Sequence, residues 1–375
     1  MKKNPPSRYR AGTLDKGLEV LETLERARAP LRIHDVVAAT GFDRAAVFRL
    51  LCTLEGRGYI ERLPDKRYHA KTRGCHSRIG YLAPLSGNAF RRDVTLGLRS
   101  AATDAGIELV TLNTSEDPSS DTIANVQVLL DARVDLVIMF QPVDSLAHVL
   151  ADRFISEGLP VISVETAVPG ALFFGGNSYR AGILAGQALG KFARANWNSS
   201  FDKLVLLESS LTSPGNQARL SGAVEGLHDI LGEIKGSKIL HIDGLAHRNS
   251  SATACMELVR SLPPRNRLLI SAFNDVSAMG ALDAFRAVKR ERWTAIVGQN
   301  GTAESRRELA VKDSALIASV AYFPEKYGEK LVRLARAVQN RERTPLAVYT
   351  DHVLLDRDSV QRYYPGELAI SSEDL

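Results

Sequence analysis

From residue 78 onward, short apolar runs alternate with stretches in which apolar side chains recur at helical spacing. The apolar runs are predicted to be strands, over residues 79–85, 107–113, 135–140, 160–165, 172–176, 203–209, 238–243, 267–273, 294–299 and 315–322. Amphipathic helices are predicted between most of them, over 90–105, 121–132, 145–157, 178–195, 216–231, 249–261 and 275–289. This alternation favours an α/β fold with a doubly wound parallel sheet. Because ten strands are many for one sheet and a gap follows Gly176, we expect two lobes.

Residues 31–70 carry a different pattern, that of two short helices and a hairpin. Gly41 interrupts the apolar positions of the first helix where a left-handed turn residue is needed, and Asp43 is a good N-cap for the second helix. The apolar positions of that second helix fall at i, i+3, i+4 and i+7, namely Val47, Leu50, Leu51 and Leu54. Residues 59–62 and 67–70 would pair as strands across a Pro-Asp-Lys turn. The pattern is that of a winged helix-turn-helix, although a helix, a turn and a helix also occur in other folds.

The exposed positions of this unit point to nucleic acid. A buried stripe on the second helix leaves a set of residues facing outward near its start, namely Arg44, Ala45, Phe48 and Arg49. We expect these to enter or flank a major groove, and we expect Lys66 and Arg67 of the wing to contact backbone phosphate. Residues 1–78 contain 17 Lys and Arg against 9 Asp and Glu, a net charge of +8, whereas the whole chain is only +5. A basic head on a slightly acidic body is typical of proteins that bind nucleic acid through the head.

Residues 12–70 resemble the winged helix-turn-helix of IclR-type bacterial transcription regulators. The matching segments are LDKGLEVLETL (14–24), TGFDRAAVFRLLCTLEGRGYIER (40–62) and the hairpin ending RYHA. The resemblance implies binding to double-stranded operator DNA, with a homodimer presenting two heads to a pseudo-palindromic site. The chain departs from the family at Ala45 and Ala46, where small hydroxyl residues are usual, and a methyl group cannot hydrogen-bond a base edge.

Residues 78–365 resemble the type I periplasmic-binding-protein fold, in the branch of ribose-binding proteins and LacI/GalR-type sensors. The matching segments include IGYLAPLSGNAFRRDVTLGLRSAATDAGIELV, IMFQPVDS, GGNSYRAG, NQARLSGAVEGL, FNDVSAMGAL and VYTDHVLLDRDSVQRYY. The resemblance divides the chain into a DNA-binding head (1–75) and a ligand-sensor body (76–375). It implies crossovers near Asn177, Tyr322 and residue 346. The first lobe then spans about 78–177 and 322–345, and the second about 178–321 and 346–375.

In open α/β sheets, ligands bind outside the carboxyl ends of the strands. The resemblance assigns ligand contacts there to Asn88, Phe90, Arg91, Gln141, Glu165, Arg219, Asn274, Asn300 and Tyr322. Arg91 stands where a second aromatic residue often lies, and Asn300 replaces a carboxylate. We therefore infer a small polar ligand less purely sugar-like than ribose, such as a sugar acid, a sugar phosphate or a polyol derivative. The alternative for Arg91 is a side chain that points to solvent.

Other classes of function are less well supported. The chain has no run of about 18 apolar residues, its basic N-terminus lacks an apolar signal segment, and its three cysteines are far apart, so we expect a cytoplasmic protein without a membrane span. Gly182, Gly186 and Gly190 favour close helix packing over a nucleotide site, and no cofactor or metal is expected. No spacing supports a catalytic residue. The main hypothesis is a ligand-responsive transcription regulator, not an enzyme. The alternative is an enzyme that acts on a sugar-like substrate, and a transport binding protein is opposed by the basic head.

Overall fold

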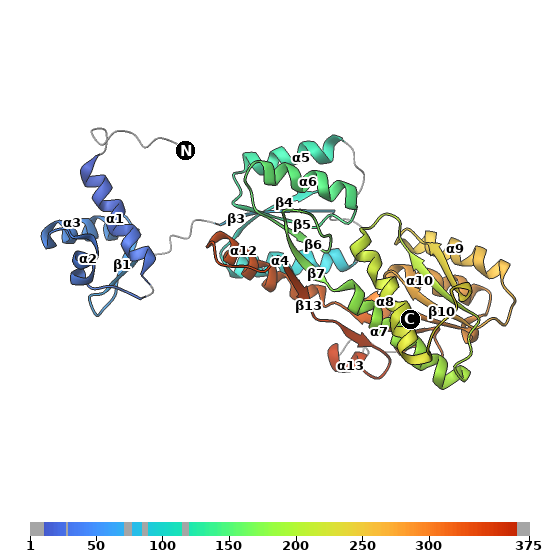
Figure 1. The fold of residues 1–375 in the computed structure, drawn as a ribbon. Coiled ribbons are helices and arrows are strands. Elements are labelled where there is room, and N and C mark those ends of the chain that lie inside the picture. The colour runs from blue at the N-terminus through green and yellow to red at the C-terminus, as the bar shows by residue number, and fades with distance from the viewer. Residues whose placement is uncertain (1–10, 28, 71–76, 85–88, 115–119, 366–375) are drawn as a thin grey trace, which may run out of the picture. The chain divides into compact units, whose positions relative to one another are not determined.

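The computed structural model describes residues 11–27, 29–70, 77–84, 89–114 and 120–365, of which 120–125 are described by their backbone alone. The chain divides into two compact units, residues 1–77 and 78–375, which are called the head and the body below. Figure 1 shows the head as three helices with a small hairpin, and the body as two lobes, each a sheet between helices. Asn88 lies outside the described residues.

The head is a winged helix-turn-helix. Its elements are α1 (Gly12–Arg26), α2 (Ile33–Thr40), α3 (Arg44–Gly56), β1 (Ile60–Arg62) and β2 (Tyr68–Ala70), the last two being antiparallel. Gly41 ends α2 with a φ of 71°, and the Asp43 carboxylate accepts a hydrogen bond from the Ala46 amide at 2.9 Å, as the sequence predicts. A core formed by every element holds the unit together, consisting of Val20, Leu24, Val36, Val47, Leu51, Ile60 and Tyr68.

The first lobe is built on a parallel sheet of order β13-β7-β6-β5-β3-β4. Its strands are β3 (Arg78–Ala83), β4 (Glu108–Asn113), β5 (Leu136–Met139), β6 (Val161–Val164), β7 (Leu172–Gly176) and β13 (Ala347–Thr350). Its helices are α4 (Ala89–Asp104), α5 (Ser120–Asp131), α6 (Asp144–Ser156) and α12 (Tyr327–Gln339), the last preceded by the 3-10 turn η4 (Pro324–Lys326). Helices α4 and α12 share a core with one face of the sheet, and α5 and α6 with the other face.

The second lobe has a sheet of order β14-β12-β11-β10-β8-β9, parallel except for β14. Its strands are β8 (Lys203–Glu208), β9 (Ile239–Asp243), β10 (Leu268–Ala272), β11 (Thr294–Asn300), β12 (Leu316–Ala321) and β14 (Val353–Leu355). Its helices are α7 (Ser178–Trp197), α8 (Pro214–Leu231), α9 (Arg248–Ser261), α10 (Asp275–Ala287), α11 (Ala303–Ala310) and α13 (Val360–Tyr363). Two further 3-10 turns are η2 (Gly236–Lys238) and η3 (Glu291–Trp293).

Three crossovers join the lobes, and the third is not where the sequence places it. The chain leaves the first lobe at Asn177 and returns at Tyr322, close to the expected positions. Strand β13 then pairs with β7, so residues 347–350 belong to the first lobe. The third crossover therefore lies between β13 and β14 rather than near residue 346. Its His352 accepts a hydrogen bond from the Asn177 amide at 2.8 Å and packs on the Tyr322 ring, so the three crossovers contact one another.

Helices α7 and α8 pack with their backbones in contact. A Cβ atom at Gly182 or Gly186 would overlap the carbonyl oxygens of Arg219 and Ala223 on α8, and a Cβ atom at Gly222 would overlap that of Tyr179 on α7. Glycine is therefore required on both helices, and the small-residue pattern of α7 serves helix packing, as the sequence favours.

The first residue of the body is anchored at the amino end of β3. The Arg78 guanidinium donates two hydrogen bonds to Glu108, at 2.9 and 2.6 Å, and one to the Ala132 carbonyl oxygen. Its amide donates to Asp135 at 2.9 Å. The point at which the head joins the body is thus fixed to three segments of the first lobe.

Candidate functional site

The start of α3 presents one exposed face. Arg44, Ala45 and Arg49 are exposed, and the Phe48 side chain keeps 48% of its surface in water although it is a large apolar group. Val47 and Leu51, on the opposite side of the helix, are fully buried. The structure therefore brings the four predicted recognition residues to a single surface of the head.

Of the two wing residues expected to contact phosphate, Lys66 is exposed and Arg67 is already paired with a carboxylate. Lys66 is exposed at the tip of the hairpin, in a left-handed conformation with a φ of 64°. The Arg67 guanidinium is half-buried and forms an ion pair with Asp65 at 2.5 Å. A phosphate group would therefore have to compete with Asp65 for Arg67, whereas Lys66 can reach solvent.

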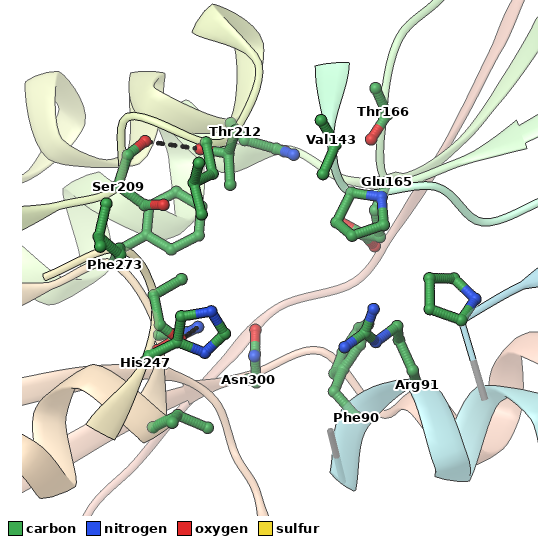
Figure 2. A pocket seen from close by; sticks show the side chains of 18 of the residues that line it. Phe90, Arg91, Val143, Glu165, Thr166, Ser209, Thr212, His247, Phe273 and Asn300 are labelled. Carbon is green, nitrogen blue, oxygen red and sulfur yellow. Dashed lines mark hydrogen bonds between the residues drawn. The ribbon is translucent and has the colours of Figure 1, made fainter. Parts of the chain in front are cut away.

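A cavity of about 480 Å³ opens between the carboxyl ends of the two sheets. Its lining comes from both lobes: Pro84, Phe90, Arg91, Thr114, Phe140, Pro142, Val143, Glu165 and Thr166 from the first, and Ser209, Leu211, Thr212, Asn216, Arg219, Leu245, Ala246, His247, Phe273, Asn274, Val276 and Asn300 from the second. Figure 2 shows Arg91 and Glu165 across the cavity from Phe273 and His247. A molecule bound here would contact both lobes.

Phe90 and Arg91 lie in the first turn of α4. The Phe90 ring packs edge-on against Phe140, Tyr322 and Tyr327, with centroids 5.7–6.2 Å apart. This contact fixes the turn, and Arg91 beside it is 8% exposed and lines the cavity. The alternative in which Arg91 points to solvent is therefore wrong.

Glu165 follows β6 and is held by its own lobe. Its Oε1 accepts hydrogen bonds from the Tyr327 hydroxyl at 2.5 Å and from the Gly176 amide at 3.0 Å. Burial raises the pKa of this carboxyl group, while the two hydrogen bonds and the charge of Arg219 oppose the increase. Glu165 therefore has a fixed position at the cavity wall and a weakened tendency to ionise.

Arg219 faces it from α8 of the second lobe, as the sequence predicts. The side chain is 4% exposed and lies over the Phe273 ring, 4.4 Å from its centroid. Nη1 donates to the Phe273 carbonyl oxygen at 2.8 Å, and Nη2 to the Ser178 hydroxyl at 3.2 Å. Its Nε is buried and has no hydrogen-bond partner in the part of the chain that the structure describes.

Asn274 and Asn300 also reach the cavity, at the ends of β10 and β11. Asn274 caps α10, because its Oδ1 accepts a hydrogen bond from the Ser277 amide at 2.7 Å. Backbone strain gathers here as well: Glu165, Leu245, Ala246 and Asn300 have positive φ angles of 62°, 53°, 56° and 107°. Strained non-glycine residues cluster at functional sites because the surrounding structure must hold them there.

Two predicted contact residues do not line the cavity. Gln141 is fully buried, and its Oε1 accepts a hydrogen bond from the Val143 amide at 3.1 Å, so it shapes the loop after β5. Tyr322 is buried behind the lining, and its hydroxyl donates to Gln299 at 3.0 Å. Its ring packs at the crossovers instead, because the Gly176 backbone leaves room for it.

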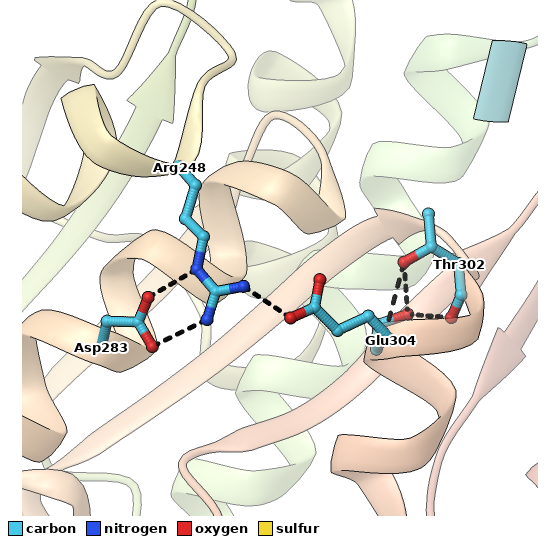
Figure 3. A network of polar contacts seen from close by, with 5 residues as sticks. Arg248, Asp283, Thr302 and Glu304 are labelled. Carbon is cyan, nitrogen blue, oxygen red and sulfur yellow. Dashed lines mark hydrogen bonds and ion pairs between the residues drawn. The ribbon is translucent and has the colours of Figure 1, made fainter. Parts of the chain in front are cut away.

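Several lining residues escaped the sequence analysis. Thr114 and Ser209 directly follow β4 and β8, and their buried hydroxyl oxygens have no hydrogen-bond partner among the described residues. His247 precedes α9, and the next residue, Arg248, ties that helix to α10 and α11 through Asp283 (2.6 and 3.0 Å) and Glu304 (2.5 Å) (Figure 3). Testing every strand end for polar side chains would have found Thr114 and Ser209.

The described part of the chain shows neither a metal-ligand cluster nor a membrane span. Within it, no three His, Cys, Asp or Glu residues are grouped so that they could hold a metal ion. Nor does any helix there have the length and apolar character needed to cross a membrane.

Comparison with known families agrees with this architecture. The profile of the periplasmic binding protein domain matches residues 79–343. The chain belongs to the periplasmic binding protein domain family. Its head matches the IclR helix-turn-helix domain over residues 13–64, so the chain joins an IclR-type head to a periplasmic-binding-protein domain. Neither of the two matched families is a family of enzymes.

Individual relatives of the periplasmic-binding-protein domain include sugar-binding proteins. The ribose import binding protein RbsB of Escherichia coli (strain K12) is 25% identical over 269 residues, which cover 71% of this chain and 86% of that protein. A solute binding protein from Actinobacillus succinogenes 130z, solved with D-allose, has a TM-score of 0.65 and 16% identity over 76% of this chain and 99% of that one. Another, from Bacillus halodurans C-125 with myo-inositol, has a TM-score of 0.66 and 19% identity over 78% and 99%.

Proposed function

We propose that this protein is a ligand-responsive transcription regulator of the bacterial cytoplasm, which binds operator DNA through the IclR-type head and a small polar, carbohydrate-type metabolite in the cleft. The observation that carries the proposal is the combination, on one chain, of an exposed recognition face on α3 with a polar cavity lined by both lobes. The relatives that bind ribose, allose or myo-inositol support a polyhydroxylated ligand.

The cleft has the chemistry that such a ligand requires. Each buried hydroxyl group needs a partner, because an unsatisfied polar group costs roughly 1–3 kcal/mol. Arginine, amide and hydroxyl side chains supply partners here, and Phe90, Phe140 and Phe273 supply apolar surface for the C–H face of a sugar ring. Since Glu165 and Arg219 belong to different lobes, a ligand that touches both would favour the closed cleft, which is the differential contact that shifts a conformational population.

The head has the chemistry for the DNA part of the proposal. We infer that Arg44, Ala45, Phe48 and Arg49 enter or flank the major groove and that Lys66 contacts phosphate, with Arg67 doing so once it leaves Asp65. A homodimer would present two heads to a pseudo-palindromic operator.

The proposal is tested with the full-length protein. An operator is first selected from a random duplex library, and thermal shift then screens neutral and acidic sugars and polyols. A ligand at 100 times its dissociation constant should stabilise the protein by about 2.7 kcal/mol. The selected ligand should change operator affinity, and sedimentation should show a dimer. The proposal fails if no duplex is enriched, or if a bound ligand leaves operator affinity unchanged.

A further inference from the structure

The two carboxylate oxygens of Glu165 have different surroundings. Oε1 accepts hydrogen bonds from the Tyr327 hydroxyl at 2.5 Å and from the Gly176 amide at 3.0 Å, whereas no described residue donates to Oε2. Glu165 is buried, yet it lines the cavity. A carboxylate can accept hydrogen bonds at both oxygens, so Oε2 is the atom to which a hydroxyl group of a bound molecule can donate.

The Tyr327 ring holds its hydroxyl group in a fixed position. The ring is buried and packs edge-on against Phe90 of α4, with centroids 5.7 Å apart, and against Phe174 of β7, with centroids 5.1 Å apart. Because aromatic rings contact it from two elements, the ring cannot follow a displaced carboxyl group. Tyr327 therefore determines where Oε1 lies, and with it the direction of Oε2.

The partners of Glu165 lie next to the crossovers between the lobes. Gly176 ends β7 directly before the first crossover, and Tyr327 begins α12 shortly after the second. The Tyr327 hydroxyl also lies 3.4 Å from the hydroxyl of Thr350, which ends β13 just before the third crossover. A displacement of Glu165 would therefore disturb contacts beside all three crossovers.

Tyr327 also favours the charged form of Glu165. Burial raises the pKa of this carboxyl group, and the Tyr327 hydrogen bond opposes the increase most, ahead of the Arg219 charge and the Gly176 amide. Tyr322, at the second crossover, is a further ionisable group that interacts with Glu165. Loss of the Tyr327 hydroxyl should therefore raise the pKa of Glu165 further, so that the carboxylate form would be lost at a higher pH.

We propose that Tyr327 is a positioning residue of the ligand site, which holds Oε1 of Glu165 so that Oε2 accepts a hydrogen bond from a hydroxyl group of the ligand. This inference rests on the proposed function and adds to its site a residue that does not line the cavity. Tyr327 acts through Glu165 and does not touch the ligand. Through Thr350, it also links the ligand contact to the segments about which the lobes move.

The test compares the full-length protein with Tyr327→Phe, which removes the hydroxyl group and keeps the ring. Isothermal titration calorimetry at several pH values uses D-ribose, D-allose and myo-inositol, the compounds named for three relatives. Tyr327→Phe should weaken binding about tenfold, as expected when a hydrogen bond to a charged group is lost or misdirected. As the pH is lowered, the affinity of the variant should also begin to fall at a higher pH than that of the wild type.

A second measurement needs no ligand. In nuclear magnetic resonance of the protein with isotope-labelled glutamate carboxyl groups, the signal that disappears in Glu165→Gln reports the ionisation of Glu165. Tyr327→Phe should move this titration to higher pH. Tyr81→Phe is the matched control, because the Tyr81 hydroxyl is buried in the same lobe but bonds Thr95 at 2.9 Å. It should leave both the titration and the affinity unchanged.

If Tyr327→Phe does not unfold cooperatively, Thr350→Val removes the neighbouring hydroxyl group and should shift the titration and the affinity in the same directions. Wild-type affinity and titration in whichever variant folds overturn the inference. Equal changes in Tyr81→Phe overturn it as well, because they would show a general effect of a lost buried hydroxyl group. If the wild type binds none of the three compounds, the proposed ligand class is contradicted, and the titration of Glu165 then supports or overturns the role of Tyr327.

Discussion

Replacing Gly222 by Ala should destabilise the second lobe, although alanine is the better helix former. The added Cβ would lie well inside 3.0 Å of the Tyr179 carbonyl oxygen and 3.0 Å from the Ile183 amide nitrogen. Because ordinary contacts begin near 3.4 Å, α7 and α8 would have to separate by roughly 1 Å. Overpacking of this kind lowers the free energy of unfolding by about 1–3 kcal/mol, and the higher helix propensity of alanine offsets about 1 kcal/mol of that loss. Since the obstacle is backbone, which cannot rotate away, we expect a cost at the upper end of this range and a net loss of up to about 2 kcal/mol.

The same helix contains the matched control. Gly215 lies in the first turn of α8, and a Cβ atom there would meet nothing closer than the Ser213 hydroxyl at 3.8 Å. Gly215→Ala should therefore stabilise the lobe by up to about 1 kcal/mol, through helix propensity and a less flexible unfolded chain. The same substitution should therefore destabilise the lobe at Gly222 and stabilise it at Gly215.

Unfolding of the second lobe can be followed by the fluorescence of the two natural tryptophans. Both tryptophans of the chain, Trp197 and Trp293, lie in the second lobe, so their fluorescence during urea unfolding follows that lobe and not the head. Equal stability of Gly222→Ala and Gly215→Ala would show that overpacking between α7 and α8 does not occur. Because α8 carries Arg219, which donates to Ser178 on α7, the Gly222 variant should also bind ligand more weakly.

Three further predictions concern single side chains. Arg49→Ala should weaken binding to all duplexes and lower the salt slope by about one if Arg49 contacts phosphate; an unchanged slope in a titration series would exclude that contact. Arg219→Ala and Glu165→Ala should each lose roughly 2–5 kcal/mol of ligand binding by calorimetry where the partner group is charged, yet keep operator binding; affinities within about twofold of wild type would show that the cleft is misassigned. Burial lowers the pKa of the His352 imidazole from 6.5 to about 4. As the pH falls, His352 is therefore protonated in the unfolded chain before it is protonated in the folded one, so the free energy of unfolding decreases between pH 6.5 and pH 4. His352→Gln should flatten that decline in urea unfolding, and an unaltered pH profile would contradict it.

The sequence predicts the strands from their continuous apolar runs and seven of the helices from apolar positions at helical spacing. The ten apolar runs correspond to β3 to β12. The central strands are apolar on both faces because both faces are buried, whereas the edge strands β4 and β9 are only partly buried. Helix α11 was missed because it is short and mostly polar, with Leu309 as its buried apolar residue. Strand β13 was missed because it is an edge strand with Tyr349 exposed, and the third crossover was misplaced as a result.

The residues of the candidate site could also be predicted only in part. The family resemblance assigned Glu165, Arg219 and Asn274 to the cleft, and all three line the cavity. Glu165 and Asn274 lie just beyond strand ends, which a parallel sheet gathers at one edge, whereas Arg219 lies on α8. That rule gives the edge but not the direction of each side chain. Gln141 turns back to the amide of Val143 in its own loop, whereas Tyr322 turns to the crossovers, where its partner His352 lies far away in the chain.

The anchoring of Arg78 bears on how a bound molecule would act on the head under the proposed function. Arg78 lies at the amino end of β3, whereas the cavity lies beyond the carboxyl end of the same strand, at Pro84. Six strand residues span about 20 Å, so the ligand and the start of the linker are separated by the full depth of the sheet. Since Glu108, Asp135 and the Ala132 carbonyl oxygen all hold Arg78, rotation of the first lobe must carry the start of the linker with it. Under the proposed function, a reorientation of the first lobe would therefore leave the cleft as a rotation of Arg78 rather than as a local change around it.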